Sequence, residues 1–247
     1  MPNKPAHSFS KATIHPQFIQ TTALIKKTTS KRSTPRSGKS ALHIPFRLMV
    51  ITDSRLCIGD LNSRLKEIYQ SGVKAVQLRE KSSPASSILE IAANANKDAV
   101  KYHSQLIIND RLDIALLSGC SSVHSPAMGI PNKEIKKYIK NSISGKSVHS
   151  IAEAVQAEKA GYDYLLFGPV FRTPAKIKFG KPQGLAKLKK VCNAVKIPVF
   201  AVGGINPARV SKCLNAGAYG VAGIRDFMTT KNVKATVSNY RKVLGTL

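Results

Sequence analysis

Residues 168–176 read Gly168-Pro169-Val170-Phe171-Arg172-Thr173-Pro174-Ala175-Lys176, and residues 198–206 read Pro198-Val199-Phe200-Ala201-Val202-Gly203-Gly204-Ile205-Asn206. In both stretches an apolar run changes to a polar loop at glycine, since residues 164–167 and residues 199–202 are apolar. A helical pattern separates the two. Short apolar runs that alternate with helices are typical of a parallel sheet with crossover helices. In such folds, ligands bind beyond the carboxyl ends of the strands.

The pair Gly203-Gly204 has two interpretations. Glycine lets a backbone approach a phosphate closely, and the helix that follows would direct its free N–H groups to the same place. Lys176, on the preceding loop, would add a positive charge. The pair could equally form only a tight turn between a strand and a helix. Taken alone, the motif leaves both interpretations open.

The same alternation extends over most of the chain. Strands are expected at 48–53, 73–78, 106–108, 121–124, 146–149, 164–167, 199–202 and 220–224. Helices are expected at 61–70, 84–102, 133–139, 152–159, 185–195 and 208–216. In addition, a short helix that ends at 117 should follow the third strand, and a C-terminal helix that ends at about 243 should follow the eighth. Eight strand–helix units predict a (β/α)8 barrel, the TIM barrel. A doubly wound open sheet is the alternative.

Composition narrows the class of protein. Of the 247 residues, 43% are hydrophobic, which is enough for one large core, and no apolar run is long enough to span a bilayer. Four scattered cysteines without a CxxC pair indicate a reducing compartment and no zinc site. The net charge of +26 could attract a polyanion, but much of it lies on expected helix exteriors. No RNA-recognition or helix-turn-helix pattern is present, so we predict neither a nucleic-acid nor a membrane partner.

Residues 1–45 differ from the rest. They contain no Asp or Glu and are rich in Ser, Thr and basic residues. This composition predicts a basic extension that is disordered or acts as a transit peptide, ahead of a barrel at 46–247. We therefore expect a cytoplasmic protein, or an organellar one if the extension is a transit peptide.

Polar residues directly after the expected strands would face one mouth of a barrel. They are cations, amides, acids, hydroxyls and a histidine: Gln77, Arg79, Glu80, Lys81, Asn109, Asp110, Ser147, His149, Thr173 and Lys176. Cationic side chains and glycine loops together are typical of a polyphosphate site, and Asp110 among them suggests Mg²⁺. His149 could act as a general base. In isolation, Arg79-Glu80-Lys81 could be a surface charge cluster and Asn109-Asp110 a helix N-cap.

Four motifs together resemble the thiamine phosphate synthase family over nearly everything from Phe46 onward. They are Gln77-Leu78-Arg79-Glu80-Lys81, Ile107-Ile108-Asn109-Asp110-Arg111, Gly168-Pro169-Val170-Phe171 with Thr173 and Lys176, and Ala201-Val202-Gly203-Gly204-Ile205. The resemblance implies a TIM barrel. It also implies that hydroxymethylpyrimidine diphosphate and a thiazole phosphate are joined to give thiamine phosphate and pyrophosphate, with Mg²⁺.

The resemblance also implies a role for each matching residue. Gln77, Arg79, Lys81 and Asn109 would bind the pyrimidine diphosphate, Asp110 would bind Mg²⁺, and Ser147 is the serine after the fifth strand. Lys176 would hold the pyrophosphate, and with Arg79 it would assist its departure. The thiazole phosphate would lie on Thr173, Gly203, Gly204 and the backbone at Gly223, Ile224 and Arg225.

Three positions depart from the family pattern. A second Mg²⁺ aspartate is expected where this chain has Gly129, a threonine where it has Ala175, and a serine where it has Arg225. Asp53 and Glu80 are other acids that could replace the missing ligand. Residues 147–154 and 164–168 also resemble the sister group, the TenI-type thiazole tautomerases, which move protons without Mg²⁺ and in which His149 would match the proposed base.

Two functions from other classes therefore stand beside the synthase. One is the metal-free tautomerase, acting on a thiazole carboxylate phosphate. The other is a non-catalytic barrel that binds a phosphate ligand or a polyanion. A homo-oligomer is compatible with each of them.

Overall fold

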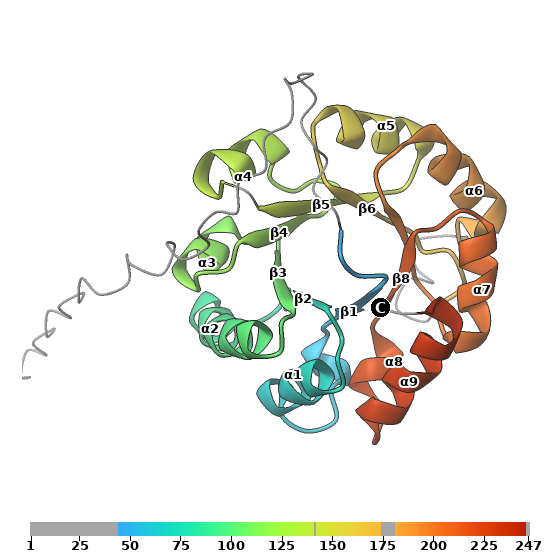
Figure 1. Ribbon diagram of the computed structural model, residues 1–247. Coiled ribbons are helices and arrows are strands. Elements are labelled where there is room, and N and C mark those ends of the chain that lie inside the picture. The colour runs from blue at the N-terminus through green and yellow to red at the C-terminus, as the bar shows by residue number, and fades with distance from the viewer. Residues whose placement is uncertain (1–43, 141, 174–180, 246–247) are drawn as a thin grey trace, which may run out of the picture. The chain divides into compact units, whose positions relative to one another are not determined.

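The computed structural model describes residues 44–140, 142–173 and 181–245. Eight parallel strands close into a barrel in the order in which they occur in the chain (Figure 1). The strands are β1 (Leu48–Ile51), β2 (Ala75–Leu78), β3 (Gln105–Asn109), β4 (Ser122–Ser125), β5 (Ile143–Val148), β6 (Tyr164–Phe167), β7 (Val199–Val202) and β8 (Gly220–Gly223). Closure is made by β1 and β8, where Leu48 is in register with Val221. The barrel is confirmed, and the open sheet is excluded.

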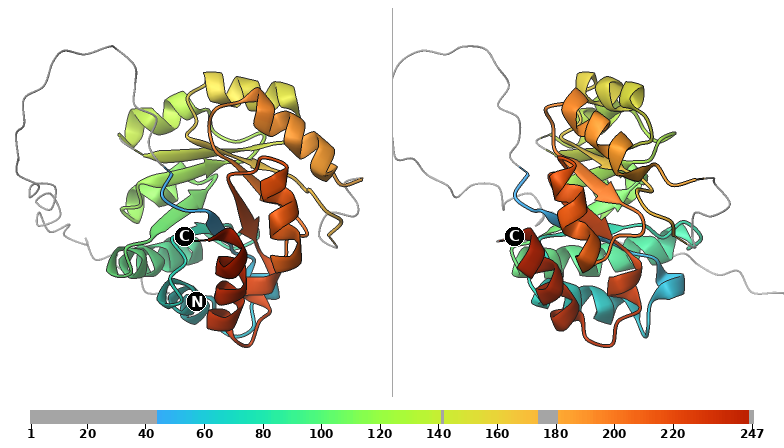
Figure 2. Two further views of the ribbon diagram at one scale, coloured as in Figure 1. Left: turned by 45° about the vertical axis from the view of Figure 1, so that its right-hand side comes forward. Right: turned by 90° about the vertical axis from the view of Figure 1, so that its right-hand side faces the viewer.

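Helices surround the barrel, as Figure 1 and the turned views in Figure 2 show. They are α1 (Leu61–Gln70), α2 (Ala85–Lys101), α3 (Leu112–Leu117), α4 (Asn132–Tyr138), α5 (Ile151–Lys159), α6 (Gly184–Ala194), α7 (Pro207–Asn215), α8 (Arg225–Met228) and α9 (Val233–Leu244), with a short 3-10 helix, η2 (Ser54–Leu56). Helices α1 and α5 begin at side-chain N-caps: Asp60 accepts from the Ser63 N–H at α1, and Ser150 accepts from the Glu153 N–H at α5. Among the described residues, no helix has the length and apolar character needed to cross a membrane.

The apolar side chains form two layers because successive residues of a strand face opposite sides of the sheet. The outer layer, between sheet and helices, contains Val50, Val76 and Val148, among others. The inner layer fills the barrel and includes Ile107 and Phe200. The barrel is therefore a packed core whose ligand-binding surface must lie at its end.

The amino-terminal end of the barrel is closed by residues that precede β1. Phe46 packs on the rings of Tyr164 and Phe200, with centroid distances of 6.3 and 5.4 Å. The Tyr219 hydroxyl donates to the carbonyl oxygen of Ile44 over 2.6 Å. Aromatic packing at this end leaves the carboxyl ends of the strands as the open mouth. Residues 1–43, to which most of the expected basic extension belongs, lie outside the described residues.

Most expected elements are found within a few residues of their predicted limits, and two differ. The fifth strand begins at Ile143, three residues before its predicted start. The additional residues at the start of the strand include the polar Ser144. This serine is buried, and both its N–H and its hydroxyl donate to Asp163. The expected single C-terminal helix is two helices, α8 and α9, separated by a turn in which Asn232 caps α9 through the Ala235 N–H.

Candidate active site

The mouth of the barrel gathers nearly all the residues that the sequence predicts for the site. β2 and the residues after it carry Gln77, Arg79 and Lys81; β3 ends at Asn109, followed by Asp110; Ser147 lies on β5 and His149 follows it; and Thr173, Gly203, Gly204, Gly223, Ile224 and Arg225 follow β6, β7 or β8 or end them. Lys176 and Ala175 lie outside the described residues. Parallel closure therefore brings together residues that are far apart in the chain.

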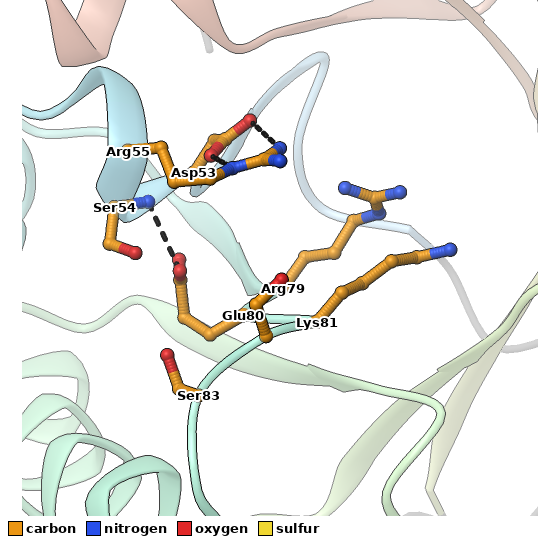
Figure 3. A pocket seen from close by; sticks show the side chains of 8 residues that line it. Asp53, Ser54, Arg55, Arg79, Glu80, Lys81 and Ser83 are labelled. Carbon is orange, nitrogen blue, oxygen red and sulfur yellow. Dashed lines mark hydrogen bonds and ion pairs between the residues drawn. The ribbon is translucent and has the colours of Figure 1, made fainter.

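Arg79 is positioned by a buried carboxylate on the next residue. The Thr52 hydroxyl donates to Glu80 Oε1 over 2.6 Å and accepts from the Arg79 backbone N–H over 2.9 Å. Ser54 N–H donates to Glu80 Oε2 over 3.0 Å. Figure 3 shows Glu80 directed toward Ser54, while Arg79 and Lys81 extend together in another direction. Glu80 thus links β2 to the segment after β1, and its two cationic neighbours remain directed away from it.

The acids near this loop already have partners. Both oxygens of Asp53 accept from the Arg55 guanidinium at 2.8 Å, and this pairing lowers the pKa of the Asp53 carboxyl. Both oxygens of Glu80 also accept hydrogen bonds. Both carboxylates are therefore already hydrogen-bonded to donors of the protein.

Inside the mouth, a buried histidine links β4 to β5. His124 Nε2 lies 2.8 Å from Ser147 Oγ, and its Nδ1 lies 3.1 Å from the Tyr164 hydroxyl oxygen. Burial lowers the pKa of His124 to about 3, with further lowering by the positive charges of Lys146 and Arg79. His124 is therefore neutral at physiological pH, and it orients Ser147 without changing charge.

Asp110 occupies an unusual backbone conformation at the end of β3. Its φ is 66°, which is uncommon outside glycine but tolerated by Asp, and its N–H donates to the His124 carbonyl oxygen over 2.9 Å. A Cβ placed on Gly129 would lie 2.9 Å from Asp110 Oδ1. The position where the family pattern has a second aspartate is thus directly beside Asp110.

A Mg²⁺ ion bound at this position would have Asp110 as its carboxylate ligand. No group of three His, Cys, Asp or Glu residues that could hold a metal ion gathers within the described part of the chain. Mg²⁺ keeps several waters and is usually bound through one or two carboxylates plus substrate phosphates. Exposed Asp110 therefore fits a metal that arrives with a diphosphate, rather than a cage built by the protein alone.

The two glycines after β7 are required by the protein's own backbone. Gly203 and Gly204 have φ of 95° and 65°. A Cβ on Gly203 would lie 2.6 Å from Pro169 Cα, and one on Gly204 would lie 2.7 Å from the Arg172 carbonyl oxygen. The Phe171 N–H donates to the Gly203 carbonyl oxygen over 3.0 Å. The glycine pair thus joins the β6 and β7 loops closely, which is the tight-turn interpretation, and it leaves the phosphate interpretation open.

The loop after β8 leads directly into α8, a single turn of helix. Gly223 is buried beneath Phe227, whose ring carbon a Cβ would approach to 2.6 Å, and Arg225 is exposed. A short extra helix after the eighth strand often contributes to a phosphate site in TIM barrels. Arg225 at its first residue would add a full positive charge there.

The sequence did not indicate two residues that support the mouth, Thr52 and Lys146. It also did not indicate that His124 is the hydrogen-bond partner of Ser147. Lys146 lies on β5, where its ammonium donates to the Pro126 and Ala127 carbonyl oxygens over 2.8 and 2.9 Å. No local motif marks these residues, because each contacts a partner at least 19 positions away in the chain. The alternation of faces along β5 was the one usable signal, since it places Lys146 on the same face as the apolar Val148.

The fold and the mouth define a class, the (β/α)8-barrel proteins with a cationic rim suited to phosphorylated ligands. The model of the thiamine monophosphate synthase family matches residues 48–227. A putative thiamine-phosphate synthase 2 of Aquifex aeolicus is 38% identical over 182 residues, covering 74% of this chain and 97% of the relative. A thiamine-phosphate synthase of Shouchella clausii is 36% identical over 193 residues, covering 77% and 92%.

A solved structure agrees with these relatives. The thiamine phosphate pyrophosphorylase from Pyrococcus furiosus superposes with a TM-score of 0.73 at 34% identity, covering 81% of this chain and 95% of that one. The chain belongs to the thiamine monophosphate synthase family. The matches support the function of a thiamine phosphate synthase, a transferase of thiamine biosynthesis.

The Glu80 link generates a first prediction. Glu80→Gln keeps the shape of the side chain but loses the charge that two hydrogen bonds share, so the segment carrying Arg79 should lose its fixed position. We expect kcat/KM for the diphosphate substrate to fall about 10- to 100-fold while the thermal unfolding temperature changes little. Steady-state kinetics measure it, with Glu67→Gln on exposed α1 as the control. Wild-type kinetics in Glu80→Gln would contradict a positioning role.

The buried His124 generates a second prediction. Its folded pKa of about 3 is below the unfolded value of about 6.5, so the unfolded chain binds the proton first, and stability is lost as pH falls below about 6.5. Replacing His124 by Gln should flatten this dependence by up to about 1.4 kcal/mol per pH unit. Urea unfolding at several pH values between about 7 and 4.5 measures the difference. Parallel stability curves for the two proteins would show that His124 does not titrate in this way.

Proposed function

We propose that this chain joins hydroxymethylpyrimidine diphosphate to a thiazole phosphate, giving thiamine phosphate and pyrophosphate. The observation that carries the proposal is the rim formed by Arg79 and Lys81 beside Asn109 and Asp110. The backbone of Arg79 is held by Glu80 through Thr52, and the guanidinium that it carries is suited to bind a diphosphate. A tautomerase, which binds no diphosphate, would have no use for this arrangement.

The reaction proposed is a dissociative substitution. The bond between the pyrimidine methylene carbon and the diphosphate oxygen breaks, and its electron pair leaves with the diphosphate. The thiazole nitrogen then donates its lone pair to the carbocation, which forms the new C–N bond. The protein's task is to hold the two partners in line and to stabilise the departing charge.

Each part of the rim has a share in that task. Arg79 and Lys81 would hold the diphosphate from the β2 side, with Lys176 from the β6 loop, and Gln77, Asn109 and Ser147 would orient the pyrimidine. Asp110 would hold Mg²⁺, which when bound supplies positive charge to the leaving group. Thr173, the Gly203-Gly204 turn and the backbone at Gly223, Ile224 and Arg225 would bind the thiazole phosphate.

The experiment is release of pyrophosphate from the two purified substrates, with and without Mg²⁺. We expect Mg²⁺-dependent release with formation of thiamine phosphate, and a loss of about 100-fold or more in Asp110→Ala, because that variant lacks the one carboxylate placed for the metal. Asp113→Ala is the matched control, since Asp113 is an exposed acid on the same segment that pairs with Arg111. Full activity in Asp110→Ala would remove Asp110 from the metal site, and no release by the wild type would remove the synthase.

One observation favours the tautomerase as a second candidate. His149 Nδ1 lies 2.7 Å from the Gly168 carbonyl oxygen, which can only accept, so Nδ1 carries a proton, and in the neutral imidazole Nε2 has the lone pair. His149 is exposed after β5, so that lone pair could accept a proton from a substrate.

The tautomerase predicts deuterium exchange into a thiazole carboxylate phosphate in ²H₂O without metal, followed by NMR. His149→Ala should abolish that exchange, because the variant lacks the base. Wild-type protein that shows no exchange, or a variant that exchanges at the wild-type rate, would rule out this role for His149.

A further inference from the structure

The segment between β4 and α4 is held by side chains from neighbouring elements. We call residues 125–130 the β4–α4 turn. The Gly129 N–H donates to the Pro126 carbonyl oxygen over 2.8 Å, which closes a β-turn. The Ile130 carbonyl oxygen accepts from both Ser125 Oγ at 2.6 Å and the Tyr162 hydroxyl at 3.0 Å. At its end Ile130 packs against the hydrophobic core, whereas Met128 in its middle is 98% exposed.

Lys146 is the charged member of this support. Ser147 faces into the barrel toward His124, so Lys146, its neighbour on β5, faces the outer side, where Val148 packs with the helices. The Lys146 ammonium donates to the Pro126 and Ala127 carbonyl oxygens and lies 5.8 Å from the centre of the Tyr162 ring. A half-buried lysine at an outward position of a barrel strand is costly unless its head group is bound, and here it is.

The turn also lies beside the candidate metal ligand. A Cβ added to Gly129 would lie 2.9 Å from Asp110 Oδ1. Burial lowers the pKa of Lys146, and the negative charges of Asp110 and Glu153 act against that lowering. The turn therefore lies beside the carboxylate of Asp110, which follows β3, and is bound by the ammonium of Lys146 on β5. The opposite charges of these two groups attract each other.

Glycine at position 129 has a consequence for the turn. It has no side chain with which the turn could bind a metal, so a bound metal cannot order the turn through this residue. Glycine also raises the conformational entropy that ordering must overcome. The turn is held by the protein itself: beside the hydroxyl contacts of Ser125 and Tyr162 with Ile130, the two carbonyl contacts of Lys146 are its charge-assisted hydrogen bonds.

We infer that Lys146 is a positioning residue that holds the β4–α4 turn beside Asp110, so that the diphosphate-binding mouth is formed before Mg²⁺ arrives. The choice of pyrophosphate as the ligand rests on the proposed function. The part that concerns the ordering of the turn rests on geometry alone. In this inference, a lysine that lies outside the mouth holds one side of the mouth in position.

The experiment compares Lys146→Met with Lys146→Arg, and uses Lys136→Met as the matched control. Lys136, on α4, is also a half-buried lysine. Its ammonium donates to the Ser142 carbonyl oxygen and to Asp163, close to the amino-terminal end of β5. The first readout is amide hydrogen exchange of a peptide covering residues 126–130, in EDTA and in Mg²⁺. The second is calorimetric binding of inorganic pyrophosphate in EDTA.

We expect the wild-type turn to exchange at the same rate in EDTA and in Mg²⁺. In Lys146→Met the turn should exchange at least tenfold faster, and pyrophosphate should bind about tenfold more weakly, because both carbonyl contacts are lost. Lys146→Arg should restore both readouts, since arginine keeps the charge and the donors. Lys136→Met should leave both unchanged, even if it lowers the unfolding temperature.

Three results would decide against the inference or separate it from the function. Unchanged exchange in Lys146→Met, or wild-type exchange that slows tenfold only when Mg²⁺ is added, would overturn it. Faster exchange in Lys146→Met together with no pyrophosphate binding by the wild type would uphold the positioning role and count against the proposed function. If Lys146→Met does not fold, Lys146→Gln, which keeps a donor without the charge, carries the same test.

Discussion

Closure of the barrel is the constraint on which the rest of the structure depends. The pairing of β1 with β8 leaves no sheet edge, and all eight strands run in the same direction. Their carboxyl ends must then meet at one mouth, while Phe46 and its aromatic neighbours fill the other end. Residues as distant in the chain as Gln77 and Gly204 can contribute to one site because of this closure, and not because of any local motif.

Closure alone does not fix the loops, which are also held by polar side chains that are buried or half-buried. Glu80 ties β2 to the segment after β1, His124 ties β4 to β5, and Lys146 ties β5 back to the β4–α4 turn. Each link replaces water by a partner in a poorly solvated place, where an unpaired group costs about 1–3 kcal/mol and a charged one more. The links thus favour one arrangement of the mouth over its alternatives. A site for a phosphorylated substrate needs such a fixed arrangement of its binding groups.

The sequence was a good guide to the fold because hydrophobic periodicity reports burial directly. The strand at 199–202 and the helix at 61–70 were predicted to the residue. The start of β5 was missed because Ser142 and Ser144 are polar yet buried, and their hydrogen bonds to Lys136 and Asp163 come from elements that periodicity does not relate. The break between α8 and α9 was missed because both helices are amphipathic and the separating turn contains no glycine or proline.

The rim residues were also predictable, since they follow the strands in the pattern of the family, and their supports were not. Thr52 and Lys146 have no motif of their own, and a lysine in an alternating strand is ordinarily read as a solvated residue. Their function depends on contacts across the barrel wall, 27 positions away for Thr52 and about 20 for Lys146. Such information becomes available only when closure has brought the strands side by side.

Gly129 is a position that the sequence pattern pointed out and whose surroundings only the structure shows. A side chain there would meet Pro126 Cδ at 2.4 Å and Ser125 Oγ at 2.7 Å, so this turn is shaped for glycine and could not accept an aspartate without moving. The turn at Gly129 contributes no charge of its own, and the charged groups beside it are Asp110 and Lys146. Mg²⁺ is usually bound through one or two carboxylates together with waters and substrate phosphates, so the single carboxylate of Asp110 is compatible with a metal that arrives with its substrate.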